Sequence, residues 1–92
     1  MSVTTEANLE SLREEIDRID RSLVELLAVR YRTVEEVARL KTRLGMMRLD
    51  PRREADVVRR AAVEARRMEI PEEGVREVVW AVIGLCRRGS AT

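Results

Sequence analysis

The feature that most constrains the fold is a stripe of apolar residues in the first half of the chain. Six leucines and isoleucines follow one another at alternating steps of three and four residues: Leu9, Leu12, Ile16, Ile19, Leu23 and Leu26. The same register returns at Val37, Leu40 and Leu44. This spacing is typical of a helix that packs along its length against another helix. It predicts a helix over residues 6–44, which at 1.5 Å per residue is about 57 Å long.

Glycine and proline mark the other helix boundaries. Gly45 follows the periodic segment and suits the left-handed position after a helix end. Asp50 and Pro51 have the chemistry of an N-cap followed by proline in the first helical position. Pro71 is followed by two glutamates, whose charges favour a helix N-terminus.

These signals predict one all-α domain of three helices. Ninety-two residues are too few for two ordinary domains, so residues 1–92 are taken as a single unit. The predicted helices are 6–44, 51–68 and 71–88. Residues 1–5 and 89–92 are expected to fray at the two ends.

The first helix is too long for the chain that carries it. A compact protein of this size has a radius of gyration of about 12 Å, far less than half the helix length. The rest of the apolar stripe therefore needs a second chain, and a symmetric homodimer is the simplest arrangement that provides one.

Composition removes several functional classes. The chain has no Phe, one Trp and one Tyr, which excludes a surface that stacks nucleic-acid bases on aromatic rings. A net charge of +1 is too small for a general nucleic-acid binder. Cys86 is the single cysteine and His is absent, so neither an internal disulfide nor an ordinary zinc site is expected. No apolar run reaches eighteen residues, so we expect a cytoplasmic protein without a membrane span.

Two cations interrupt the apolar stripe. Past Leu26, the count lands on Arg30 and Thr33, and Lys41 lies eleven residues beyond Arg30, about 20° further round the helix. A buried arginine is costly unless an anion meets it. The alternative is a slightly rotated helix in which Leu27 and Val34 carry the seam and Arg30 extends to solvent. Lys41 is the only lysine beside seventeen arginines.

The second helix carries an anomaly of opposite sign. Its apolar stripe is Val58, Ala61, Ala65 and Met68, and stepping back four residues gives Glu54. A glutamate there can simply complement the helix dipole, and Asp50 can simply be a cap. Arg53 at the same helix end opposes the dipole, which suggests another role.

Together these groups suggest a cavity for a small dicarboxylate that carries a hydroxyl. Guanidinium groups would bind the carboxylates, and Glu54 would accept from the hydroxyl. The sequence offers no Ser-His or Cys-His pair, no metal cluster and no phosphate-binding loop. An enzyme built this way would work by positioning and electrostatics.

The pattern resembles a known family. The stretch LREEIDRID at residues 12–20, then Arg30, Lys41 and the run DPRRE at residues 50–54, is similar to the all-helical (AroQ-type) chorismate mutases, at their spacing and without gaps. The likeness covers residues 9–88. It implies an intertwined homodimer of three-helix chains with two active sites. The implied reaction is the Claisen rearrangement of chorismate to prephenate in phenylalanine and tyrosine biosynthesis, without cofactor or metal.

The resemblance also implies residue roles. Lys41, Arg30 and Glu54 would be catalytic: Lys41 would bind the ether oxygen, Arg30 a carboxylate, and Glu54 the ring hydroxyl together with Asp50. Arg53 would bind a carboxylate as well. Arg13 would join from the second chain, since it lies 28 residues from Lys41, about 42 Å along one helix.

The third helix departs from the family pattern. Its usual late glutamine corresponds to Ser90, and Cys86 stands where a serine is common. We expect Cys86 and Arg87 to bind substrate, with Arg87 or Arg88 replacing the missing donor; otherwise the isolated chain is weakly active. The simpler interpretation of Cys86 is a small apolar residue on the helix stripe formed by Val75, Val79, Val82 and Cys86. Some short members of the family are activated by docking onto 3-deoxy-heptulosonate-phosphate synthase.

The sequence is also compatible with other functions. Isochorismate pyruvate lyase and aminodeoxychorismate mutase use the same scaffold. A non-catalytic helical dimer that regulates a larger enzyme is a different class, and a structural coiled-coil dimer is the simplest alternative.

Overall fold

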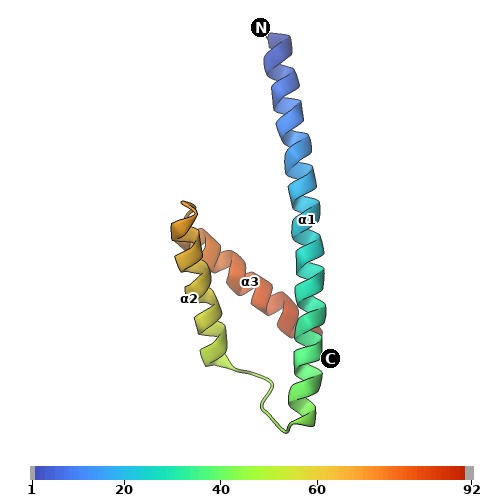
Figure 1. The fold of residues 1–92 in the computed structure, drawn as a ribbon, viewed down its shortest axis with the longest axis vertical. Helices are drawn as coiled ribbons and strands as arrows, with labels where there is room; N and C mark the ends of the chain where they lie inside the picture. The colour runs from blue at the N-terminus through green and yellow to red at the C-terminus, as the bar shows by residue number, and fades with distance from the viewer. Residues whose placement is uncertain (1, 91–92) are drawn as a thin grey trace.

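The structure, a computed structural model, describes the backbone of residues 2–90 and the side chains of residues 5–87. It consists of three helices: α1 (Ser2–Arg43), α2 (Pro51–Arg67) and α3 (Glu72–Ser90) (Figure 1). The all-α class is therefore confirmed. α1 begins before the predicted start and α3 continues past the predicted end, because adding a turn to an existing helix costs little. Of the ends expected to fray, Met1, Ala91 and Thr92 lie outside the described residues.

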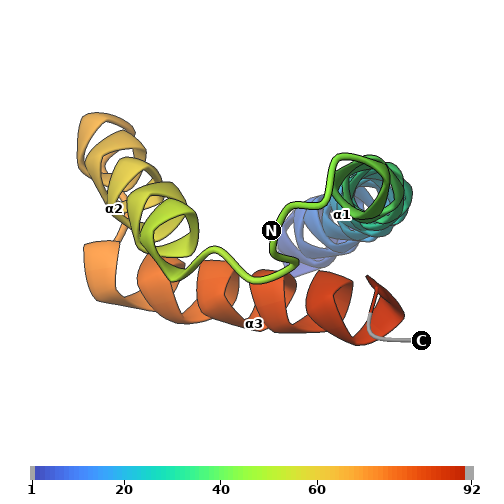
Figure 2. The same ribbon diagram turned by 90° about the horizontal axis from the view of Figure 1, so that it is seen from below.

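The three helices do not form a compact bundle. α2 and α3 form a hairpin, and α3 crosses the C-terminal half of α1, while the N-terminal half of α1 projects away (Figures 1 and 2). Within the described residues, α3 packs on both other helices, whereas α1 and α2 do not pack on each other. The radius of gyration is 17.9 Å and the extents are 65 × 25 × 16 Å. A compact chain of this length would have a radius of gyration of about 12 Å.

The buried core lies between α2 and α3, near α1. Its members are small or medium-sized residues: Val58, Ala62, Ala65, Ile83 and Cys86. The predicted stripe of α2 is correct at Val58 and Ala65 but wrong at Met68, which is 63% exposed. Because α2 ends at Arg67, Met68 lies in the turn that follows and not on the packed face.

The apolar stripe of α1 has no cover from its own chain. All six residues from Leu9 to Leu26 in the 3-4 register are between 48% and 66% exposed. They lie on α1, whose N-terminal half projects away from α2 and α3 (Figure 1). A long exposed apolar surface of this kind is typical of an interaction surface.

The loop between α1 and α2 is fixed by local chemistry. Gly45 has φ 68°, its N–H donates to the carbonyl of Thr42 at 3.2 Å, and the N–H of Met46 donates to the carbonyl of Lys41 at 2.9 Å. These two bonds form the Schellman motif that the glycine predicts. At the other end of the loop, Asp50 caps α2, because its Oδ1 accepts from the N–H of Arg53 at 3.1 Å.

The turn between α2 and α3 uses the same motif without a glycine. Glu69 has φ 60°, and the N–H of Ile70 donates to the carbonyl of Ala65 at 3.0 Å. Arg66 Nε lies 2.6 Å from Glu72 Oε1 across the turn. The hydrogen bond and the opposite charges raise the pKa of Arg66 and lower the pKa of Glu72.

No helix in the described residues is both long and apolar enough to cross a membrane.

Candidate active site

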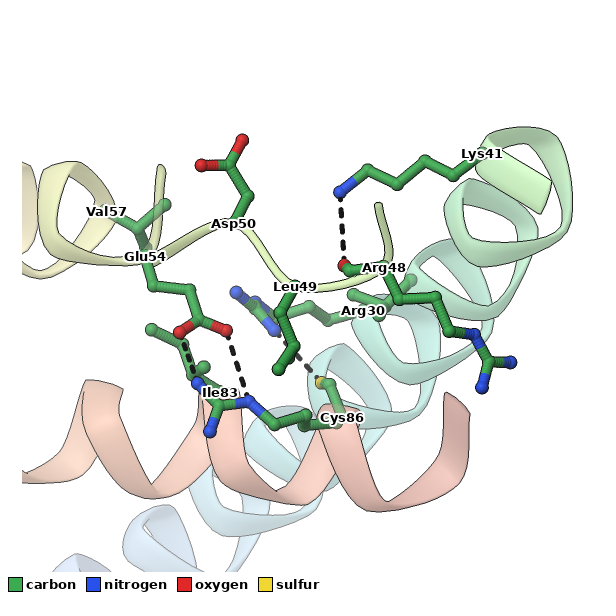
Figure 3. A pocket seen from close by; sticks show the side chains of 11 residues that line it. Arg30, Lys41, Arg48, Leu49, Asp50, Glu54, Val57, Ile83 and Cys86 are labelled. Atoms are coloured by element: carbon green, nitrogen blue, oxygen red, sulfur yellow. Dashed lines mark hydrogen bonds and ion pairs between the residues drawn. The ribbon is translucent and has the colours of Figure 1, made fainter. Parts of the chain in front are cut away.

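A pocket of about 490 Å³ lies where the three helices and the α1–α2 loop approach one another (Figure 3). Its wall has contributions from α1 (Arg30, Val34, Lys41), the loop (Arg48, Leu49, Asp50), α2 (Glu54, Val57) and α3 (Ile83, Cys86, Arg87). Four of these side chains are basic and two are acidic. The wall therefore favours a small anion.

Arg30 enters the pocket from the face of α1 that meets α3. Its side chain is half-buried, and its Nη1 donates to Cys86 Sγ at 3.0 Å. Figure 3 shows the guanidinium extending into the pocket and not toward outer solvent. The break in the apolar stripe is thus where α1 faces the pocket.

Lys41 approaches from the last turns of the same helix. Its Nζ donates to the carbonyl oxygen of Arg48 in a long contact of 3.4 Å (Figure 3). The Lys41 carbonyl accepts from the N–H of Met46 in the Schellman motif, which holds this turn in place. Within the described residues, no carboxylate pairs with Lys41 or Arg30. Two cations without acidic partners therefore share one pocket.

Glu54 has a strong partner from α3. Arg87 Nε donates to Glu54 Oε2 at 3.2 Å, and Arg87 Nη2 pairs with Glu54 Oε1, so the contact is bidentate (Figure 3). This hydrogen bond and the charge of Glu54 raise the pKa of Arg87. The first turn of α2 and the last turns of α3 are thereby joined beside the pocket.

Asp50 has two relations to the site. It lies in the pocket wall, and one oxygen of its carboxylate caps α2. The cap predicted from the sequence is therefore confirmed, and the predicted contact of Asp50 with a substrate hydroxyl stays a prediction.

Two of the predicted site residues lie elsewhere in this single chain. Arg13 is exposed on the N-terminal half of α1, and Arg53 is exposed on the first turn of α2; neither lines the pocket. The Arg53 backbone contributes only the N–H that Asp50 accepts. The side chains of Arg88 and Ser90 lie outside the described residues.

Sequence reasoning missed other wall residues. Arg48 and Leu49 belong to the short loop between α1 and α2. A loop has no periodicity from which the direction of a side chain can be predicted. The available signal was their position between the glycine that ends α1 and the cap that starts α2. Val34, Val57 and Ile83 supply an apolar part of the wall.

The wall chemistry suits an organic dianion with an apolar body. Arg30 and Lys41 offer charge-assisted donors, and Glu54 and Asp50 offer acceptors. No cluster of three or more potential metal ligands occurs among the described residues.

The structure is thus an all-helical fold with a pocket whose wall carries four basic and two acidic side chains. Residues 12–90 match the family model described as chorismate mutase type II, and the chain belongs to this family.

Two curated relatives are both named T-protein. The protein from Enterobacter agglomerans is 35% identical over 77 residues, which is 84% of this chain and 21% of the relative. The protein from Haemophilus influenzae (strain ATCC 51907 / DSM 11121 / KW20 / Rd) is 37% identical over 67 residues, which is 73% of this chain and 16% of the relative. The chain thus spans about a fifth of the length of these relatives. No solved structure gives a significant match.

Proposed function

We propose that this chain catalyses the rearrangement of chorismate to prephenate in phenylalanine and tyrosine biosynthesis. The observation that carries the proposal is the pair Arg30 and Lys41, which face one pocket without a carboxylate partner in the described part of a chorismate mutase family chain.

The reaction matches the groups available. In a Claisen rearrangement the ether C–O bond breaks while a new C–C bond forms, with no proton transfer and no nucleophile. Catalysis then requires holding the two reacting carbons together and stabilising the negative charge that grows on the ether oxygen. Fixed cations in a partly enclosed pocket can do both.

Lys41 is assigned to the ether oxygen. Its ammonium is a compact charge that can concentrate on one oxygen, whereas a guanidinium suits the two oxygens of a carboxylate. Arg30 is assigned to a substrate carboxylate. Glu54 and Asp50 would accept from the ring hydroxyl, and Cys86 and Arg87 complete the α3 side of the wall.

The second carboxylate would be bound by Arg53, once its exposed side chain turns toward the pocket, and by Arg13 of the partner subunit in an intertwined homodimer. The exposed apolar stripe of α1 supports this dimer, because a second chain would cover it. Arg13 lies in the same stretch of α1 and does not line the pocket of its own chain, so only a partner's pocket could receive it. We place the enzyme in the cytoplasm, and 3-deoxy-heptulosonate-phosphate synthase is a candidate activating partner.

The test is to incubate the purified chain with chorismate and follow the loss of chorismate absorbance, with identification of prephenate. A parallel reaction with isochorismate is assayed for pyruvate, and each reaction is repeated with the synthase. Prephenate formation supports the proposal. Pyruvate from isochorismate alone would assign a lyase, and no turnover in any reaction would overturn the enzymatic assignment.

A further inference from the structure

Two consecutive residues of α3 contact the pocket groups that come from the other two helices. Cys86 contacts Arg30 of α1, and Arg87 contacts Glu54 of α2 (Figure 3). We propose that Cys86 and Arg87 are positioning residues, which act on the reaction through Arg30 and Glu54 and not through contact with the substrate. This inference rests on the proposed function and replaces the substrate-binding role expected for both residues.

The geometry of the Arg87 contact favours orientation over simple charge balance. Two adjacent guanidinium nitrogens meet the two oxygens of one carboxylate, which fixes the plane of the Glu54 carboxylate. Each carboxylate oxygen has about two acceptor positions, so each can still accept from a substrate hydroxyl. The Glu54 side chain is 20% exposed and that of Arg87 is 46% exposed. Arg87 is thus the more exposed member of a pair that lines the pocket.

The Cys86 contact holds Arg30 without neutralising it. The Cys86 sulfur accepts from Arg30 of the neighbouring helix. Because Cys86 is only 2% exposed, it offers little surface to a ligand. A thiol is a weak, uncharged acceptor, and a guanidinium has five N–H donors. After one donor meets Cys86 Sγ, the full charge and the remaining donors of Arg30 stay available for a carboxylate. A carboxylate in place of Cys86 would cancel that charge.

The two possible roles of Arg87 differ in a double-mutant cycle. Arg87→Met is compared in the wild-type background and in Glu54→Gln, which keeps an acceptor at position 54. In the wild-type background we expect kcat/KM to fall by about tenfold, because a misplaced catalytic group can cost up to about a hundredfold. In the Glu54→Gln background the further loss should stay within about twofold. The same loss in both backgrounds would show that Arg87 acts independently of Glu54 and would overturn its positioning role.

Arg87→Lys separates orientation from charge. Lysine keeps the positive charge but loses the bidentate geometry. If orientation matters, Arg87→Lys should resemble Arg87→Met; full activity in Arg87→Lys would contradict the inference.

Cys86 is tested with two substitutions of opposite kind. Cys86→Ser keeps a neutral acceptor, and Cys86→Val fills the space without one. We expect Cys86→Ser to stay within about twofold of wild type, while Cys86→Val raises KM more than it lowers kcat, because Arg30 binds a carboxylate throughout the reaction. The effect of Cys86→Val should disappear in an Arg30→Lys background. Equal losses with and without Arg30 would overturn the role.

The matched control is Arg66→Met, which removes an arginine–glutamate pair that lies outside the pocket. The kcat/KM of Arg66→Met should not change.

A readout independent of turnover is the ¹⁵N resonance of the Arg87 Nε–H group in the free protein, which should move in Glu54→Gln but not in Arg66→Met. An inactive wild type with this response would refute the proposed function alone. An active wild type whose resonance does not respond would refute the positioning inference alone.

Discussion

At the scale of single residues, the choice of lysine at position 41 makes the strongest claim. A chain with seventeen arginines keeps one lysine, and that lysine lies in the pocket wall. If Lys41 stabilises charge that develops only in the transition state, Lys41→Ala should lower kcat by about a hundredfold or more and change KM little. Lys41→Arg should also be poor.

Steady-state kinetics on chorismate check this, with Arg43→Ala as the matched control. Arg43 is an exposed cation on the same last turn of α1 and does not line the pocket. An effect of Lys41→Ala confined to KM would mean that Lys41 only binds a carboxylate.

The sequence could predict those site residues whose position follows from helical periodicity. The 100° step per residue places Arg30 and Lys41 on one helix face, and the α2 stripe points to Glu54; all three line the pocket. The Arg87–Glu54 pair joins residues 33 apart. Its formation depends on how α3 folds back on α2, which no local pattern specifies.

At the scale of elements, the two Schellman turns give a matched pair of predictions about stability. Glu69 has φ 60°, a conformation that costs a residue with a side chain more than it costs glycine. We expect Glu69→Gly to raise the free energy of unfolding by about 0.5–1 kcal/mol, and urea denaturation measures it. A loss of stability would show that the Glu69 side chain contributes a compensating interaction.

Gly45→Ala is the converse. Gly45 has φ 68°, and an added Cβ would meet no atom within 4 Å, so only the backbone conformation opposes alanine. We expect the free energy of unfolding to fall by about 1 kcal/mol. An unchanged stability would mean that the loop can adopt another conformation at no cost.

The elements were predictable to the extent that their ends carry residues of known preference. Gly45, Asp50 and Pro51 mark the α1–α2 loop by local chemistry, and the structure has a C-cap and an N-cap there. The end of α2 was harder, since Glu69 occupies a left-handed position that glycine usually takes. The 3-4 spacing of the α2 stripe therefore extends to Met68, although the helix ends one residue earlier.

At the scale of the whole molecule, the shape of a single chain predicts assembly. The radius of gyration of 17.9 Å shows that a single chain is extended. The apolar stripe of α1, the longest helix, is exposed because no part of its own chain covers it. Hydrophobic burial against a second chain would supply it. We predict an obligate dimer, with loss of helical signal on dissociation. Light scattering and circular dichroism over a dilution series test this; a helical monomer at low concentration would contradict it.

The central claim, a chorismate mutase site shared between two chains, is tested most directly by mixing two inactive variants. If each pocket takes Lys41 from one chain and Arg13 from the other, Arg13→Ala and Lys41→Ala homodimers both lack an intact site. In a mixed dimer, the Arg13→Ala chain still provides Lys41, and its partner still provides Arg13. One of the two sites is therefore complete, and the other carries both substitutions.

The measurement is mutase activity after the two variants are unfolded together and refolded, compared with separately refolded controls. Random pairing makes about half of the dimers mixed, so about a quarter of all sites should recover activity. No recovery, with mixed dimers demonstrated by mass spectrometry, would mean that Arg13 acts within its own chain or not at all, and would contradict the shared site.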